Sequence, residues 1–129
     1  MRVEQEKVRQ FHEHIDYPRA DKPTLVDHAL EEQRFNFILE ELDEYLDATE
    51  RDDIVGIADA LADLLYVVLG TAVVHGIDLQ PVFDAVHASN MTKSPSTTVG
   101  TFKGCFKGEG YRAPQIAELL LLQSTGLQS

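Results

Sequence analysis

One stretch of this chain limits its fold more than any other: residues 54–77 are almost entirely apolar, yet they contain Asp59 and Asp63. The apolar periodicity predicts a helix from about Asp53 to His75, which Gly76 ends. A helix that is apolar almost all round is buried on several sides. Burying an unpaired carboxylate is costly, so we expect the two aspartates to meet a cation, either a metal ion or a buried Arg or Lys.

The same stretch does not have the composition of a membrane span. Its longest charge-free run, Leu64–Val74, is too short to cross a bilayer. We therefore expect a helix that lies in a core or an interface. A 129-residue monomer cannot easily cover so much apolar surface, so we predict at least a homodimer with this helix at its centre.

The rest of the chain also has helical periodicity, and no segment predicts a convincing strand. Besides the central helix, we expect helices over about Val3–Asp16, Val26–Thr49, Asp78–Ser89 and Pro114–Leu122. These elements predict an all-α fold of four to five helices, a helical bundle completed by oligomerisation. We expect one domain over residues 1–129, with a flexible basic loop over about 90–113.

The second helix combines an apolar stripe with an acidic run. The stripe consists of Phe35, Ile38, Leu39, Leu42, Leu46 and Thr49. The run E-E-L-D-E places Glu40 and Glu44 nearly opposite that stripe and Glu41 on its flank. Such a run is usually a solvated helix face. A short turn to the central helix predicts antiparallel neighbours, however, which brings the run level with Asp59 and Asp63. Converging carboxylates are the ligands that Mg²⁺ requires.

The overall charge narrows the classes of partner. A net charge of −11 argues against a nucleic-acid backbone or an anionic membrane, since both need a basic surface. A substrate that carries phosphates would need metal ions between it and the chain. The single cysteine, Cys105, excludes an internal disulfide and a cysteine-based zinc site. Together with the charged residues 1–16, which lack a targeting pattern, this predicts a cytoplasmic protein.

The segment after Asn90 supplies the positive charge that the acidic run lacks. It is rich in Ser, Thr and Gly, and its basic residues are Lys93, Lys103, Lys107 and Arg112. A flexible basic segment is a reasonable clamp for phosphates. Ordinary lysines of a surface loop are the other interpretation.

Four short motifs resemble those of the all-α nucleoside triphosphate pyrophosphohydrolases, the MazG-like superfamily. E-E-L-D-E resembles its E-E-x-x-E signature, and D-A-L-A-D resembles the following E-x-x-D, with Asp63 on the aspartate. S-N-M-T-K (89–93) and F-K-G-C-F-K-G-E-G-Y (102–111) resemble the phosphoribosyl-ATP pyrophosphohydrolase branch. The chain departs from the signature at Ala60, where a glutamate is usual, and has Asp59 one place earlier. On a helix those two places share a face, so Asp59 could take over with a shorter reach.

The resemblance implies hydrolysis of a (d)NTP or modified NTP between the α- and β-phosphates, giving a nucleoside monophosphate and pyrophosphate. It implies Mg²⁺, or Mn²⁺ in its place, as cofactor and a homodimer or homotetramer as assembly. The residue roles that it implies are metal binding for Glu41, Glu44, Asp59 and Asp63, general base for Glu40, phosphate contacts for Lys93, Lys103 and Lys107, and sugar or base contacts for Asn90 and Tyr111.

Two other functions remain open. The chain could be phosphoribosyl-ATP pyrophosphohydrolase itself, the enzyme of histidine biosynthesis, with the same site and another substrate. It could also be a non-catalytic helical module that binds metal or nucleotide. Ala60 favours the module, whereas Glu41, Glu44 and Asp63 oppose it.

Overall fold

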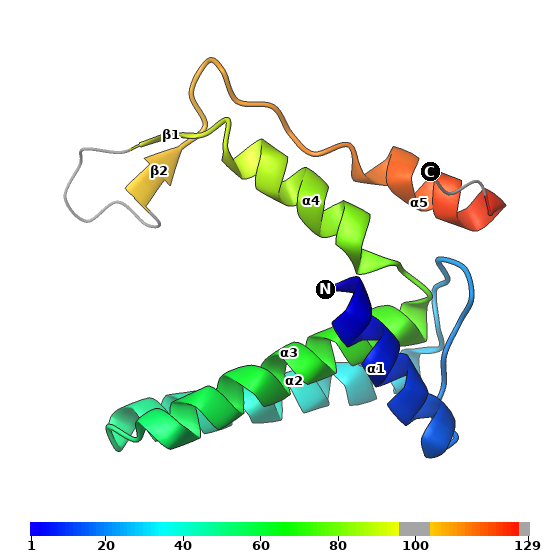
Figure 1. Cartoon of the computed structure of the whole chain (residues 1–129), viewed down its shortest axis with the longest axis vertical. Coiled ribbons are helices and arrows are strands. Elements are labelled where there is room, and N and C mark those ends of the chain that lie inside the picture. The colour runs from blue at the N-terminus through cyan, green and yellow to red at the C-terminus, as the bar shows by residue number, and fades with distance from the viewer. Residues whose placement is uncertain (96–103, 127–129) are drawn as a thin grey trace. The chain divides into compact units, whose positions relative to one another are not determined.

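The structure, a computed structural model, describes residues 1–95 and 104–126. Its elements are α1 (Arg2–His14), α2 (His28–Glu50), α3 (Ile54–His75), α4 (Leu79–Asn90), β1 (Ser94–Pro95), β2 (Cys105–Phe106) and α5 (Ile116–Thr125) (Figure 1). The predicted all-α class is confirmed, and each predicted helix is present with small shifts at its ends. The two short strands pair antiparallel, Ser94 opposite Phe106, and were not predicted.

The chain forms two compact units, Met1–Leu79 and Gln80–Ser129. In the second unit, the end of α4 is tied to the segment that leads to α5: the Ser89 hydroxyl donates to the Arg112 carbonyl at 2.6 Å, and the Arg112 N–H donates to Thr92 Oγ1 at 2.9 Å. Part of the predicted flexible loop, residues 96–103, lies outside the described residues. The single domain over 1–129 stays a prediction.

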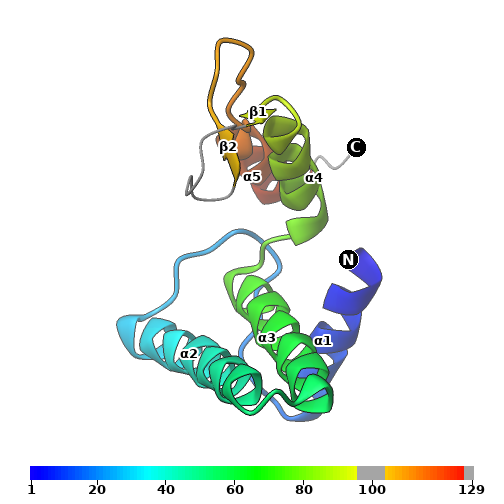
Figure 2. The same ribbon diagram turned by 90° about the vertical axis from the view of Figure 1, so that its left-hand side faces the viewer.

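Capping residues set the ends of the α2–α3 hairpin. The Asp53 carboxylate caps α3 by accepting from the Gly56 N–H at 3.0 Å, as Asp27 does for α2. Gly76 ends α3 as predicted, with φ of 67° in the left-handed region. A Cβ there would lie 2.1 Å from the Lys22 carbonyl oxygen, so this position requires glycine for space as well. The helices pack side by side as antiparallel neighbours (Figures 1 and 2).

The register of this hairpin repeats at intervals of seven residues. The facing pairs are Ala48 with Gly56, Glu41 with Asp63, and Arg34 with Gly70. A Cβ built on Gly56 would lie 3.2 Å from the Ala48 Cβ, and one on Gly70 would lie 2.6 Å from Arg34 Nη2. Seven residues are about two helical turns, or about 10.5 Å. Each facing pair is one layer of the hairpin. The layer with the carboxylates therefore lies between two layers in which α3 has a glycine and the two helices approach closely.

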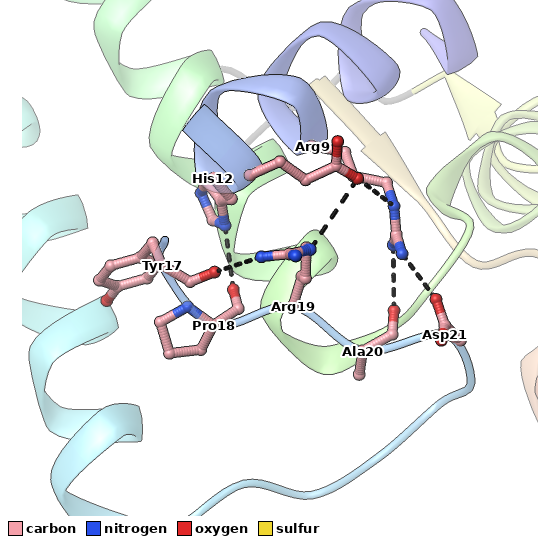
Figure 3. A network of polar contacts seen from close by, with 8 residues as sticks. Arg9, His12, Tyr17, Pro18, Arg19, Ala20 and Asp21 are labelled. Carbon is pink, nitrogen blue, oxygen red and sulfur yellow. Dashed lines mark hydrogen bonds and ion pairs between the residues drawn. The ribbon is translucent and has the colours of Figure 1, made fainter. Parts of the chain in front are cut away.

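The first helix packs against α3 and holds the long connection to α2. Val8 of α1 forms a buried core with Leu69 and Val73 of α3. Figure 3 shows how α1 binds the segment that follows it: a His12 ring nitrogen contacts the Pro18 carbonyl at 3.1 Å, and Arg9 donates to Asp21 at 2.6 Å.

Much of the apolar surface of α2 and α3 is exposed in this single chain. Four members of the predicted α2 stripe, Phe35, Leu39, Leu42 and Leu46, are 42–63% exposed. In the most apolar 18-residue stretch of α3, only 33% is buried in the single chain. The predicted burial on several sides is therefore met in part. By length and composition α3 is one helix that could cross a membrane, a weak indication that core helices of soluble proteins also give. The exposed stripe of α2 and the exposed Leu61, Leu65 and Tyr66 of α3 form the surface that the predicted assembly, with α3 at its centre, would cover.

We expect the chain to form at least a dimer, because this stripe is too apolar to remain in water. Light scattering at micromolar concentration should give that mass. Leu46→Lys should weaken the assembly, since burying one leucine contributes about 1.5–3 kcal/mol. Leu25→Lys is the matched control, because Leu25 is 88% exposed and lies outside both helices. A folded wild-type monomer would contradict the prediction.

Candidate metal centre

Three carboxylates converge between α2 and α3. Glu41 and Glu44 share one face of α2, three residues apart, and Asp63 faces them from α3. One oxygen of each lies within 4.8 Å of the others. Oxygen ligands of one Mg²⁺ ion each lie about 2.1 Å from it, so two ligands can be about 4 Å apart. A small adjustment of these side chains would give that spacing.

Glu41 has the clearest chemical fit to a bound cation. Its Oε2 is fully buried and has no hydrogen-bond partner. Leaving a buried polar atom unpaired costs about 1–3 kcal/mol, and more for a charged group. No ion pair joins Glu41, Glu44 or Asp63 to Arg or Lys in the part of the chain that the structure describes. The buried Arg or Lys that we considered as partner for the aspartates is therefore not seen there. A hard divalent cation fits this all-oxygen donor set.

The electrostatics of Glu41 point the same way. Burial raises the pKa of the Glu41 carboxyl, and the negative charges of Glu44 and Asp63 raise it further. The charge of Glu40 adds to the rise. The folded chain therefore holds an anionic Glu41 at a cost that a bound cation would remove.

The other predicted residues of this unit, Asp59 and Glu40, are not in the group of three. Asp59 is exposed, and the structure does not bring it into the group of three. Its neighbour Ala60, where the signature has glutamate, is only 2% exposed. Glu40 is exposed on α2, next to Glu41. The roles of Asp59 and Glu40 stay predictions.

The predicted substrate contacts belong to the second unit. Asn90 is exposed and is the last residue of α4, and Lys93 follows it half-buried. The Lys107 ammonium lies 5.0 Å from the centre of the Tyr111 ring, so the structure brings these two together. Lys103 lies outside the described residues.

An open pocket of about 430 Å³ lies at the end of α1, not at the carboxylates. Its lining residues are Arg9, Asp16, Tyr17, Pro18, Arg19 and Asp21; Figure 3 labels all of them except Asp16. Arg9 is already bound to Asp21 and to the Ala20 carbonyl. The pocket has two arginines and two aspartates, and both arginines already form ion pairs, so it gives no ground for assigning a ligand.

The sequence matches one family. Residues 8–90, well over half of the chain, match the description phosphoribosyl-ATP pyrophosphohydrolase. The chain belongs to this family. A search of curated proteins gave no match. The matched region includes all of α2 and α3, and thus all three converging carboxylates.

Membership establishes the activity in coarse terms. The phosphoribosyl-ATP pyrophosphohydrolase family is of the MazG-like, all-α type, so the resemblance seen in the sequence is confirmed. The chain is a pyrophosphohydrolase of nucleotide substrates, of a type that depends on a divalent metal.

Sequence reasoning missed Arg34, the most buried arginine of the hairpin. It is 5% exposed and occupies the same face of α2 as Glu41, one heptad earlier. The available signal was the run Arg34, Glu41 and Ala48 at seven-residue spacing, opposite two glycines and an aspartate of α3 at the same spacing.

We expect Glu41→Gln to stabilise the metal-free protein near neutral pH, because it removes a negative charge that burial and the carboxylates of Glu44 and Asp63 disfavour. A carboxyl whose pKa is raised by folding binds more protons in the folded than in the unfolded chain. Its contribution therefore lowers the free energy of unfolding as pH rises from the ordinary value of 4.5 through the raised pKa. Melting curves in EDTA should show the gain near neutral pH and lose it below 4.5.

Glu32→Gln is the control, because Glu32 is exposed on α2 outside the cluster. A Glu41→Gln variant that melts below wild type near neutral pH would show that the carboxylate has a structural partner.

We also expect Mg²⁺ to stabilise the folded chain, by about 2.7 kcal/mol when its concentration is one hundred times the dissociation constant. Glu44→Gln and Asp63→Asn should remove that rise in melting temperature, because each deletes a ligand charge. Glu50→Gln should keep it, since Glu50 is an exposed carboxylate at the end of α2. An equal rise in all four proteins would mean that the ion binds elsewhere.

Proposed function

We propose that this protein is a Mg²⁺-dependent nucleoside triphosphate pyrophosphohydrolase that cleaves a (d)NTP or modified NTP between the α- and β-phosphates. The observation that carries the proposal is the buried, unpartnered Oε2 of Glu41 at the point where Glu44 and Asp63 converge. A chain with a net charge of −11 repels a triphosphate, so an acidic centre is useful to such a substrate only through a metal. Membership of the pyrophosphohydrolase family supports the same reaction class.

Different residues of the chain would bind the metal ion and activate the attacking water. Glu41, Glu44 and Asp63 would hold the ion, with the exposed Asp59 at the margin. When bound, Mg²⁺ supplies a Lewis acid that offsets charge on the phosphate oxygens. Glu40 would accept a proton from the attacking water. The water oxygen forms a bond to phosphorus at the α–β anhydride, the bridging P–O bond breaks, and pyrophosphate leaves beside the nucleoside monophosphate.

Residues of the second unit would bind the substrate's anionic and polar groups. We assign phosphate contacts to Lys93, Lys103 and Lys107, and sugar or base contacts to Asn90 and Tyr111. The support is the chemistry of the side chains, together with the placing of Lys107 over the Tyr111 ring.

A second candidate is phosphoribosyl-ATP pyrophosphohydrolase, because the family's description names that substrate. It would use the same carboxylates. A panel assay separates the candidates: canonical and modified NTPs and phosphoribosyl-ATP, each with Mg²⁺, with pyrophosphate and phosphate measured separately. We expect pyrophosphate from at least one NTP. Turnover of phosphoribosyl-ATP alone would establish the second candidate, and metal binding without any turnover would leave a non-catalytic module.

Glu40→Gln should separate catalysis from metal binding. If Glu40 removes the proton from water, the variant should lose about 10²–10⁴-fold in kcat while keeping the Mg²⁺-induced rise in melting temperature. Asp43→Asn is the matched control, an exposed carboxylate of the same acidic run outside the converging group. Loss of metal stabilisation in Glu40→Gln would instead make Glu40 a ligand.

A further inference from the structure

Among the described residues, Arg34 is a buried cation without a carboxylate partner. Its side chain leaves α2, and the residue is only 5% exposed. Across residues 1–95 and 104–126, no ion pair includes it. Buried arginines are usually paired with an acid, so the contacts that replace one indicate what this residue does.

Those contacts clamp α2 to two successive turns of α3. Arg34 Nη2 donates to the Val67 carbonyl at 2.8 Å, and Nε donates to Thr71 Oγ1 at 3.1 Å. The Thr71 hydroxyl itself donates to the same Val67 carbonyl at 2.8 Å. The two acceptor atoms therefore lie 2.8 Å apart, and a planar guanidinium that donates to both allows little sliding of one helix along the other.

The surroundings hold the guanidinium in that orientation. Its carbon lies 5.5 Å from the centre of the Tyr17 ring and 5.2 Å from that of Phe37. Gly70 supplies the space, because a Cβ there would lie 2.6 Å from Arg34 Nη2 and 3.1 Å from His12 Nε2. The side chain therefore has contacts from the connection after α1 and from both hairpin helices.

The hydrogen bonds from Arg34 to Val67 and Thr71, called the clamp below, lie along the same α2–α3 contact, or seam, as the carboxylates. Arg34 and Glu41 share a face of α2, seven residues apart, and Gly70 and Asp63 do so on α3. A slip of one residue along α3 would move Asp63 by about 1.5 Å relative to Glu41. In a formed site, metal–ligand distances stay within about 0.2 Å of their usual values, and a backbone shift of one residue exceeds the small side-chain adjustment that the three carboxylates need. The geometry of the metal site thus depends on the register between α2 and α3. The clamp fixes that register about two helical turns from the carboxylates.

We propose that Arg34 is a positioning residue of the metal centre: by bonding Val67 and Thr71, it sets the α2–α3 register that brings Glu41 and Asp63 to one ion. This inference rests on the metal site of the proposed function. The decisive property is that the planar guanidinium donates two hydrogen bonds in fixed directions. Lysine has the same charge but not this geometry, so it is not a substitute.

The test is Mn²⁺ affinity, read from the free-ion signal in electron paramagnetic resonance well below the melting temperature. Arg34→Lys and Arg34→Gln should each raise the dissociation constant about 10–100-fold, the usual effect of losing a group that orients metal ligands. Thr71→Val, which keeps the shape and removes one acceptor, should shift it in the same direction. In turnover assays these variants should need more Mg²⁺ for half-maximal rate but approach the wild-type kcat at saturation.

Val8→Ala is the matched control for lost stability, because Val8 lies in the α1–α3 core and is not one of the residues hydrogen-bonded to Arg34. It should lower the melting temperature and leave the Mn²⁺ dissociation constant unchanged. Wild-type affinity in Arg34→Lys would overturn the proposal, since charge would then suffice, and so would wild-type affinity in Thr71→Val. A wild-type protein that binds no Mn²⁺ would instead refute the metal site of the proposed function, and this inference with it.

Discussion

The repulsion among three carboxylates between α2 and α3 is the constraint on which the rest of this structure depends. Glu41, Glu44 and Asp63 bring like charges within 4.8 Å, and one Glu41 oxygen is buried without a partner. Such a layer would push two helices apart unless the packing on both sides resists. The neighbouring layers provide that resistance, with glycine opposite Ala48 on one side and opposite the Arg34 clamp on the other. The folded chain is thereby held ready for a cation, so that binding and stability are coupled.

The parts of the fold that sequence could predict are those set by local signals. Asp53 as cap, Gly76 as terminator and the short turn between α2 and α3 fix two antiparallel helices, and from them the meeting of Glu41 with Asp63 follows. The pair of two-residue strands has too few residues for any periodicity, and it went unpredicted. The type of each element could thus be predicted wherever the capping residues and the apolar periodicity agreed.

Which face of a helix meets which neighbour was harder to predict. The apolar stripe of α2 is exposed in the single chain, whereas the face toward α3 carries Arg34 and Glu41. Periodicity identifies an apolar face but does not say what covers it. On α3, neighbouring residues differ by about 100° in direction, which is enough to leave Asp59 exposed while Ala60 is buried. Sequence spacing alone could not separate those two environments.

Ala60, where the signature has glutamate, also affects the net charge of the metal centre. A glutamate at this position would lie one turn before Asp63, on the buried side of α3, and would add a fourth negative charge to the seam. Without it, three carboxylates face each other, and one divalent cation neutralises all but one of their charges. Ala60 therefore lowers the repulsion that the Arg34 and Gly56 layers must withstand, and it does so without removing any of the three oxygens that converge.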